Sequence, residues 1–168
     1  MGTSTRTMGI SVTDVDTSAK LPLGYEYHEP ASNDNLGDKV WIYILADEAL
    51  AVGDIVQVNP DWGSPFHGHK SDGGNTNSEL IGVAQHAIAS ASYGFVLKRG
   101  YAAYIQGDGS VAAGESVMCH ASTDGMADTW AAGSAAEEKI FGLAFTADAA
   151  DTDYDSRVLF AGLINCGV

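Results

Sequence analysis

The chain has 168 residues, 45% of them hydrophobic, which is enough to bury a core in one domain without disulfides or metals. The formal net charge of −14, from 22 acidic and 8 basic residues, argues against partners that need clustered Lys and Arg, namely nucleic acids and anionic membranes. The first eight residues carry no apolar signal-peptide region and no stretch approaches a membrane span, so we expect cytoplasmic synthesis.

Residues 1–38 differ in composition from the rest of the chain. They are rich in Thr, Ser, Asp and Asn, and Pro22 and Pro30 interrupt any regular element. A disordered tail is one interpretation. The aromatic pair Tyr25 and Tyr27 favours the other, an extended N-terminal arm that becomes ordered on a partner or on a neighbouring subunit.

From Lys39 onward the sequence is typical of β-strands. The run Lys39–Leu45 has apolar side chains on both faces, which predicts a strand covered on both sides or one that lies at an interface. Turn signals such as Asp124-Gly125 separate the other candidates. These are Asp54–Val58, Leu80–Ile88, Tyr93–Arg99, Tyr101–Gln106, Glu115–Cys119, Lys139–Ala147 and Arg157–Asn165. Many short strands predict an all-β domain over 39–168, a small β-barrel or β-sandwich.

An internal repeat runs from about 50–106 to 111–166. Gly53-Asp54 at the start of the first copy matches Gly114-Glu115 in the second, each just before a short strand. Gly82 and Gly142 then match within a later strand, where glycine usually marks a bulge or a close backbone approach. Two similar halves can close around a shared core that neither would cover alone.

Candidate metal ligands are sparse. His67 and His69 could present both rings on one face of a strand near Asp61 and Asp72, but the segment 59–78 is rich in Pro, Gly, Asn and Ser and predicts an exposed loop. The acidic run 151–155 resembles the start of a calcium loop, yet an EF-hand needs Gly and Glu where Ser156 and Gly162 stand. A solvated turn and ordinary surface histidines are the simpler interpretations, so we predict no metal site.

Catalytic motifs are absent from the sequence. It holds no nucleophile elbow, zinc-protease motif or phosphate-binding loop, and Gly107-Asp108-Gly109 fits a β-turn better than a dinucleotide site. We therefore predict a protein that is not an enzyme and binds no cofactor. Cys119 and Cys166 are interpreted as two buried thiols, with a single disulfide left open.

The order of several short motifs resembles phage capsid decoration proteins, also called head-stabilising or cement proteins. The resemblance covers residues 39–168, and its motifs are strand ends, glycine bends and turns. They are Val40–Ile44, Ala49–Val56, Ile81–Ala84, Tyr93–Val96, Val111–Val117, Ile140–Ala144 and Gly162–Asn165.

This resemblance implies a non-catalytic virion protein made in the host cytoplasm. It would sit on the outer capsid surface, bridge major capsid subunits and help the shell resist the pressure of the packaged DNA. Its partners would be the major capsid protein and copies of itself, as a dimer or trimer. Because interface energy concentrates in aromatic and Arg anchors, we predict contacts through Arg6, Lys20, Tyr25, Tyr27, Trp41 and Trp62.

Three other functions stay open at this point. A virion-displayed module that binds glycans or a host surface would use Trp62 and Trp130 with the polar loops. A tail or baseplate component would assemble into rings or tubes. A metal-dependent hydrolase would need His67 and His69 as ligands.

Overall fold

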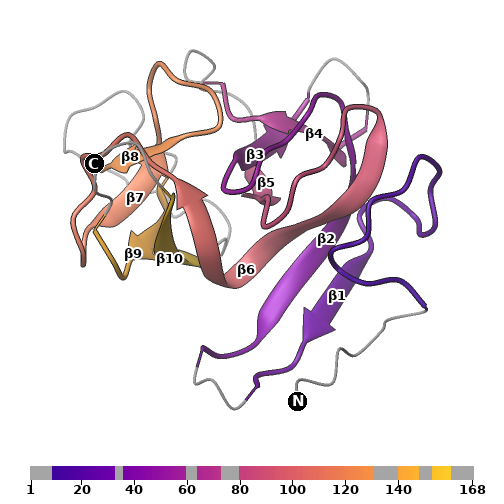
Figure 1. The fold of residues 1–168 in the computed structure, drawn as a ribbon, viewed down its shortest axis with the longest axis horizontal. Coiled ribbons are helices and arrows are strands. Elements are labelled where there is room, and N and C mark those ends of the chain that lie inside the picture. The colour runs from indigo at the N-terminus through magenta and orange to yellow at the C-terminus, as the bar shows by residue number, and fades with distance from the viewer. Residues whose placement is uncertain are drawn as a thin grey trace.

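The computed structural model describes residues 9–32, 36–59, 64–72, 80–130, 140–147 and 153–159. Within these segments every regular element is a strand, which confirms the predicted all-β class (Figure 1). The strands are β1 (Glu26–Glu29), β2 (Lys39–Ala46), β3 (Ile55–Val58), β4 (His67–Lys70), β5 (Leu80–Val83), β6 (Ser92–Gln106), β7 (Ser116–Cys119), β8 (Ala127–Thr129), β9 (Ile140–Ala144) and β10 (Asp153–Leu159). The described segments hold no helix with the length and apolar character needed to cross a membrane.

Five strands of the first half form a closed barrel. Their order is β2-β4-β3-β5-β6, and β6 pairs again with β2 to close it. Every pairing is antiparallel except β2 with β4, where Leu45 lies opposite His67 in a parallel register. Closure leaves no free edge among these five strands, which removes a site of aggregation.

The barrel has apolar residues on both sides of its wall. One buried cluster contains Ile42, Ile44, Val56 and Val96. A second cluster contains Trp41 and Tyr43 from the opposite face of β2. The run around β2 was predicted either to be covered on both sides or to lie at an interface, and the structure shows the first, since residues 40–44 are all buried.

β6 links the two halves. The sequence predicted two strands here, but β6 is continuous through Gly100, whose φ of +119° suits a glycine. Its first half closes the barrel against β2, and its second half pairs with β10. From β10 the sheet continues through β9 and β7 to β8 (Figure 1). A parallel bridge from Gly107 to Ala127 brings β8 back beside the end of β6.

The two halves repeat the same backbone geometry, as the predicted fold of two similar halves requires. Gly53 and Gly114 both have φ of +88°. The Gly53 N–H donates to the Ala84 carbonyl at 2.7 Å, and the Gly114 N–H donates to the Ala144 carbonyl at 2.8 Å. β2 and β4 pair in parallel in the first half, and the Gly107–Ala127 bridge is parallel in the second.

Glycines in β5 and β9 lie beside equivalent bulges in the two halves. On β5 the register against β3 slips beside Gly82, and on β9 the register against β7 slips beside Gly142. A Cβ on Gly82 would lie 2.6 Å from the Leu97 carbonyl oxygen, so the backbones approach too closely for any side chain. The bulge and close approach predicted for Gly82 are therefore confirmed.

The described N-terminal residues lie against the barrel of their own chain. Asp16 and Tyr93 exchange backbone hydrogen bonds of 3.0 and 2.8 Å, and β1 pairs with β2. Leu21 is buried, and Leu23 packs against the same cluster as Tyr43. Part of the predicted arm therefore completes the core of its own subunit.

Three short strands were not predicted. β1 falls in the expected arm, β4 falls in the expected exposed loop 59–78, and β8 follows the Asp124-Gly125 turn. The loop prediction was wrong for residues 67–70, because β4 lies between β2 and β3. The acidic run 151–155 lies partly outside the described residues, and the predicted strand residues 160–165 lie entirely outside them.

Candidate functional site

The structure places four of the six predicted contact residues and separates them by burial. Lys20 is exposed, and its backbone N–H donates to the Tyr43 hydroxyl at 3.2 Å. Tyr25 and Tyr27 are half-buried against the core. Trp41 is only 6% exposed, so its ring offers little surface to a partner. Arg6 and Trp62 lie outside the described residues.

Trp41 instead holds β1 in place. Its indole N–H donates to the Glu29 carboxylate at 2.8 Å. A buried indole N–H needs such an acceptor, because leaving it unpaired would cost free energy. The residue is therefore a structural member of the barrel wall.

Two adjoining pockets form a groove at one end of the barrel, and Lys98 lines both. We call it the basic groove. The first pocket, of about 170 Å³, is lined by Glu26, His28, Val40, Lys98 and Arg99. The second, of about 250 Å³, is lined by Ile42, Val58, Pro65, Phe66, Leu80, Ile81 and Lys98.

Strand irregularity places Lys98 in this groove. Val40 lies opposite Arg99 while Trp41 lies opposite Leu97, so Lys98 is an extra residue in a β-bulge of β6. A bulge breaks the alternation of side chains and redirects one of them. Lys98 pairs with Glu26 from β1. The groove could have been found in the sequence only by knowing that β1 and the start of β4 meet β6 here.

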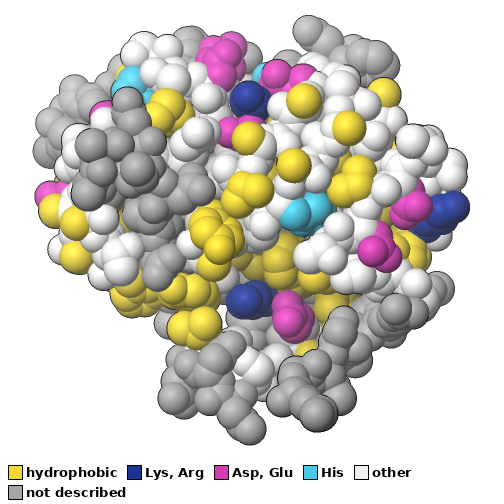
Figure 2. All heavy atoms as spheres, viewed as in Figure 1, with side chains coloured by type: hydrophobic (Ala, Val, Ile, Leu, Met, Phe, Trp, Pro, Cys, Tyr) yellow, Lys and Arg dark blue, Asp and Glu magenta, His cyan; other side chains and the backbone are white. Residues whose placement is uncertain are grey.

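The face drawn in Figure 2 is poor in basic side chains. Hydrophobic side chains gather in the lower part of the view, around a basic and an acidic side chain that lie side by side. Of the basic residues with described side chains, Lys98 and Arg99 both line the basic groove, and Lys39 lies close by, 3.0 Å from the position of a Cβ on Gly100. The basic groove is thus a local exception on a chain of charge −14.

His67 and His69, the predicted metal candidates, have protein partners instead. The His67 Nδ1 lies 3.0 Å from an Asp47 carboxylate oxygen. The His69 Nε2 lies 3.2 Å from the Val58 carbonyl and 3.3 Å from the Gln57 amide nitrogen. Within the described segments, no third ligand joins these two histidines.

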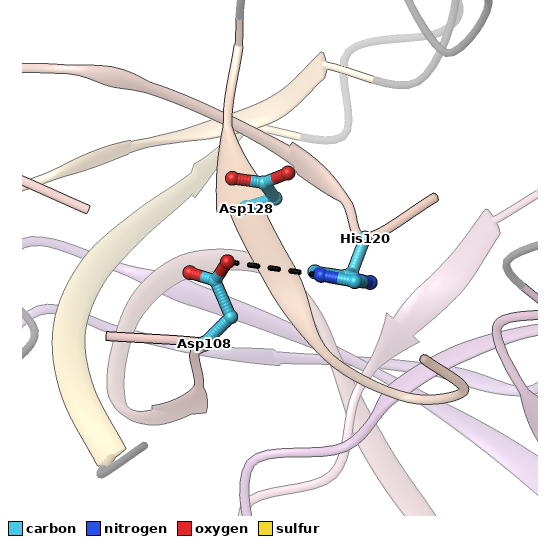
Figure 3. Close-up of side chains that lie close together, drawn as sticks. All are labelled: Asp108, His120 and Asp128. Carbon is cyan, nitrogen blue, oxygen red and sulfur yellow. Dashed lines mark ion pairs between the residues drawn. The ribbon is translucent and has the colours of Figure 1, made fainter. Parts of the chain in front are cut away.

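The structure brings together a cluster that the sequence did not indicate. Asp108 from the turn after β6, His120 from the end of β7 and Asp128 from β8 converge with ligand atoms within 4.8 Å of one another (Figure 3). The His120 Nε2 lies 3.7 Å from the Asp108 carboxylate. In the sequence Asp108 is part of an ordinary turn. The parallel bridge between Gly107 and Ala127 brings Asp128 near Asp108, and the pairing of β7 with β8 brings Asp128 near His120.

The hydrogen bonds of His120 argue against a metal here. Its Nδ1 accepts the backbone N–H groups of Ser122 at 3.1 Å and Thr123 at 2.9 Å, so it carries no proton. The proton of the neutral ring then sits on Nε2, the atom that faces the carboxylates. A histidine that binds a metal through Nε2 normally donates a proton from Nδ1, which this turn forbids. The cluster instead stabilises the turn between β7 and β8, because His120 accepts hydrogen bonds from the backbone of that turn.

Comparison with known proteins places the fold. No family model matches the chain, and no curated protein matches its sequence. Three solved chains match the structure, among them the N base of head fiber gp8.5 from bacteriophage phi29, with a TM-score of 0.51. The match covers 71% of this chain and 93% of that one at 12% sequence identity. At so low an identity the likeness concerns the fold alone, and this chain shares the fold of that head-fibre base.

Proposed function

We propose that this chain is a structural virion protein that binds the outer surface of a phage capsid and stabilises the shell. The observation that carries the proposal is the shared fold with a phage head-fibre base over most of both chains. In this proposal its partner is the major capsid protein, and the chain has no catalytic role.

Two features of the molecule suit this role. The barrel and the strands that continue from it form one hydrogen-bonded all-β sheet, with one continuous strand, β6, through both halves. A net charge of −14 favours solubility at the high local concentration of an assembly. A capsid repeats the same site many times, so weak individual contacts can add up across neighbours.

The other virion functions lack a supporting observation. The alternative of glycan binding would use Trp62, which lies outside the described residues, and Trp130, which is half-buried with its indole nitrogen enclosed. A tail component would need self-assembly into rings or tubes. Among the residues that the structure describes, no specific contact or surface favours either function.

The test is binding to purified phage heads that lack this protein. Heads and protein are mixed over a range of concentrations, sedimented together and quantified. Saturable binding with a fixed number of copies per head supports decoration, and digestion of the bound chain by a protease added to intact heads would locate the chain outside the shell. Absence of saturable binding would refute the proposal.

The structure also decides which truncation is informative. Removing residues 1–38 would delete β1 and Leu21 and so disturb the core. A variant that lacks residues 1–8 keeps all the residues that the structure describes. If Arg6 belongs to a capsid-binding arm, this shorter deletion weakens head binding without changing the unfolding midpoint.

A further inference from the structure

The size of the pocket beside Lys98 limits what it can hold. Its volume of about 250 Å³ is below the roughly 300–1,000 Å³ typical of small-molecule sites. Apart from Lys98, its lining is apolar. It includes Ile42, Val58, Phe66 and Ile81, which come from four different strands or strand ends. A pocket of this size and character suits one inserted apolar side chain, the usual form of an interface anchor.

The neighbouring pocket of the basic groove is lined mainly by charged and polar side chains. Lys98 and Arg99 outnumber the single acid, Glu26, which Lys98 already engages. Arg99 is exposed, and within the described residues no carboxylate pairs with it. The exposed guanidinium of Arg99 has the geometry to bind a carboxylate of a partner through paired hydrogen bonds.

The groove is held by a fixed backbone. Lys98 sits in a bulge, and Gly100 follows with φ of +119° and a Cβ position only 2.8 Å from the Asp38 carbonyl oxygen. Bulges occur preferentially where a strand re-aims a side chain, often beside functional sites. The Val40–Arg99 pairing anchors one wall, and the Glu26–Lys98 ion pair joins β1 to β6 across the groove.

We propose that the basic groove is the docking site for an acidic, extended segment of the capsid partner. The segment places one apolar side chain against Phe66, Leu80 and Ile81 and one carboxylate beside Arg99. This inference rests on the proposed capsid function, because it names the part of the partner that the chain would recognise.

The first test reverses the exposed charge. Arg99→Glu and the double variant Ala113→Glu/Thr123→Glu change the net charge equally, but Ala113 and Thr123 are exposed residues that do not line the basic groove. Binding of the full chain to heads that lack it should weaken at least about tenfold for Arg99→Glu. The double variant should stay within about twofold, and Arg99→Lys should recover part of the loss. Equal weakening by Arg99→Glu and the double variant, or by neither, would overturn the groove assignment while leaving capsid binding intact.

A second test works without capsids. The probe is an acetylated five-residue peptide with a central phenylalanine flanked by glutamates, titrated into the ¹⁵N-labelled full chain. Chemical-shift changes should concentrate at Lys98, Arg99 and Leu80, and a peptide with lysines in place of the glutamates should bind several-fold more weakly. No shift at these residues with either peptide would overturn the inference, even if heads bind the protein elsewhere.

Discussion

Asp54 and Glu115 occupy equivalent positions in the two halves, but their pKa values are shifted in opposite directions. Each carboxylate accepts a backbone N–H three residues earlier, from Ala51 at 2.7 Å and from Ala112 at 2.8 Å. Asp54 is 1% exposed, and burial raises its pKa above the ordinary value of 3.8. The pKa of Glu115 falls below 4.5 because the Ala112 N–H, together with the Thr129 hydroxyl, stabilises its charge.

These directions predict opposite effects of pH on stability. Because the folded protein holds the Asp54 proton more tightly than the unfolded chain does, ionisation of Asp54 costs stability as pH rises through its folded pKa. Wild type should therefore gain stability relative to Asp54→Asn as pH falls from neutral toward 3.8. Wild type should lose stability relative to Glu115→Gln as pH falls from 4.5 through the lowered pKa of Glu115.

Urea unfolding at a series of pH values measures both differences. Each variant is compared with wild type at the same pH, so the titration of the other acidic residues cancels. Slopes of the same sign for the two variants would contradict the assigned environments.

Gly82 offers a second prediction at the residue scale. In Gly82→Ala the new methyl group would meet the Leu97 carbonyl oxygen at 2.6 Å, and backbone cannot move aside easily. We expect Gly82→Ala to lower the free energy of unfolding by an amount near the upper end of the range typical of overpacking, about 1–3 kcal/mol. Gly114→Ala is the control, since its Cβ meets nothing within 4 Å and only its φ of +88° is strained, which costs about 1 kcal/mol. If thermal denaturation showed equal losses of stability for Gly82→Ala and Gly114→Ala, the close approach of the backbones at Gly82 would be contradicted.

At the scale of elements, the sequence revealed strands with strong local signals and missed those that depend on neighbours. β2 is dense in β-branched and aromatic residues, so its own composition predicts it. β4 reads His-Gly-His-Lys and becomes a strand only because β2 and β3 flank it. Gly100 looked like a strand end, but a glycine tolerates the positive φ that lets β6 continue.

The candidate site was harder to predict than the fold. The sequence singled out Trp41 as a candidate aromatic anchor for a partner, whereas the structure buries it. The basic groove combines Lys98 with Glu26 and Phe66, which are distant in sequence and meet only once the barrel closes. The composition shows that basic residues are few, but it does not show where they lie in the fold. The direction of the Lys98 side chain depends on a bulge that only the strand pairing reveals.

The N-terminal segment yields a prediction about an element that the sequence treated as an arm. Leu21 is buried at 6% exposure beside Tyr43 and Phe95, so Leu21→Ala should leave a cavity and lower stability by about 2–5 kcal/mol. Val15, 41% exposed on the same segment, is the control, and Val15→Ala should change stability by less than about 0.5 kcal/mol. If Leu21→Ala were as mild as Val15→Ala, residues 9–29 would not be part of the folded core.

At the scale of the whole molecule, the two halves are joined by more than β6. One buried cluster contains Ile55 and Phe95 from the first half together with Val117 and Ala127 from the second. The Gly125 turn of the second half adds to β3 of the first, because the Ile55 N–H donates to the Gly125 carbonyl at 2.8 Å. Neither half can therefore separate without exposing apolar surface and breaking backbone hydrogen bonds.

This shared core predicts that the protein unfolds in one cooperative step. Trp41 reports on the first half and Trp130 on the second, and 5-fluorotryptophan labelling gives each its own ¹⁹F resonance, assigned with Trp→Phe variants. Both resonances should disappear at the same urea concentration, because a folded half without its neighbour would expose half of a common core. Ile55→Ala and Val117→Ala, in different halves, should each lower that single midpoint for both probes. Separate midpoints, or a variant that shifts only the probe in its own half, would mean that the halves are independent modules and that the Gly125 contact contributes little.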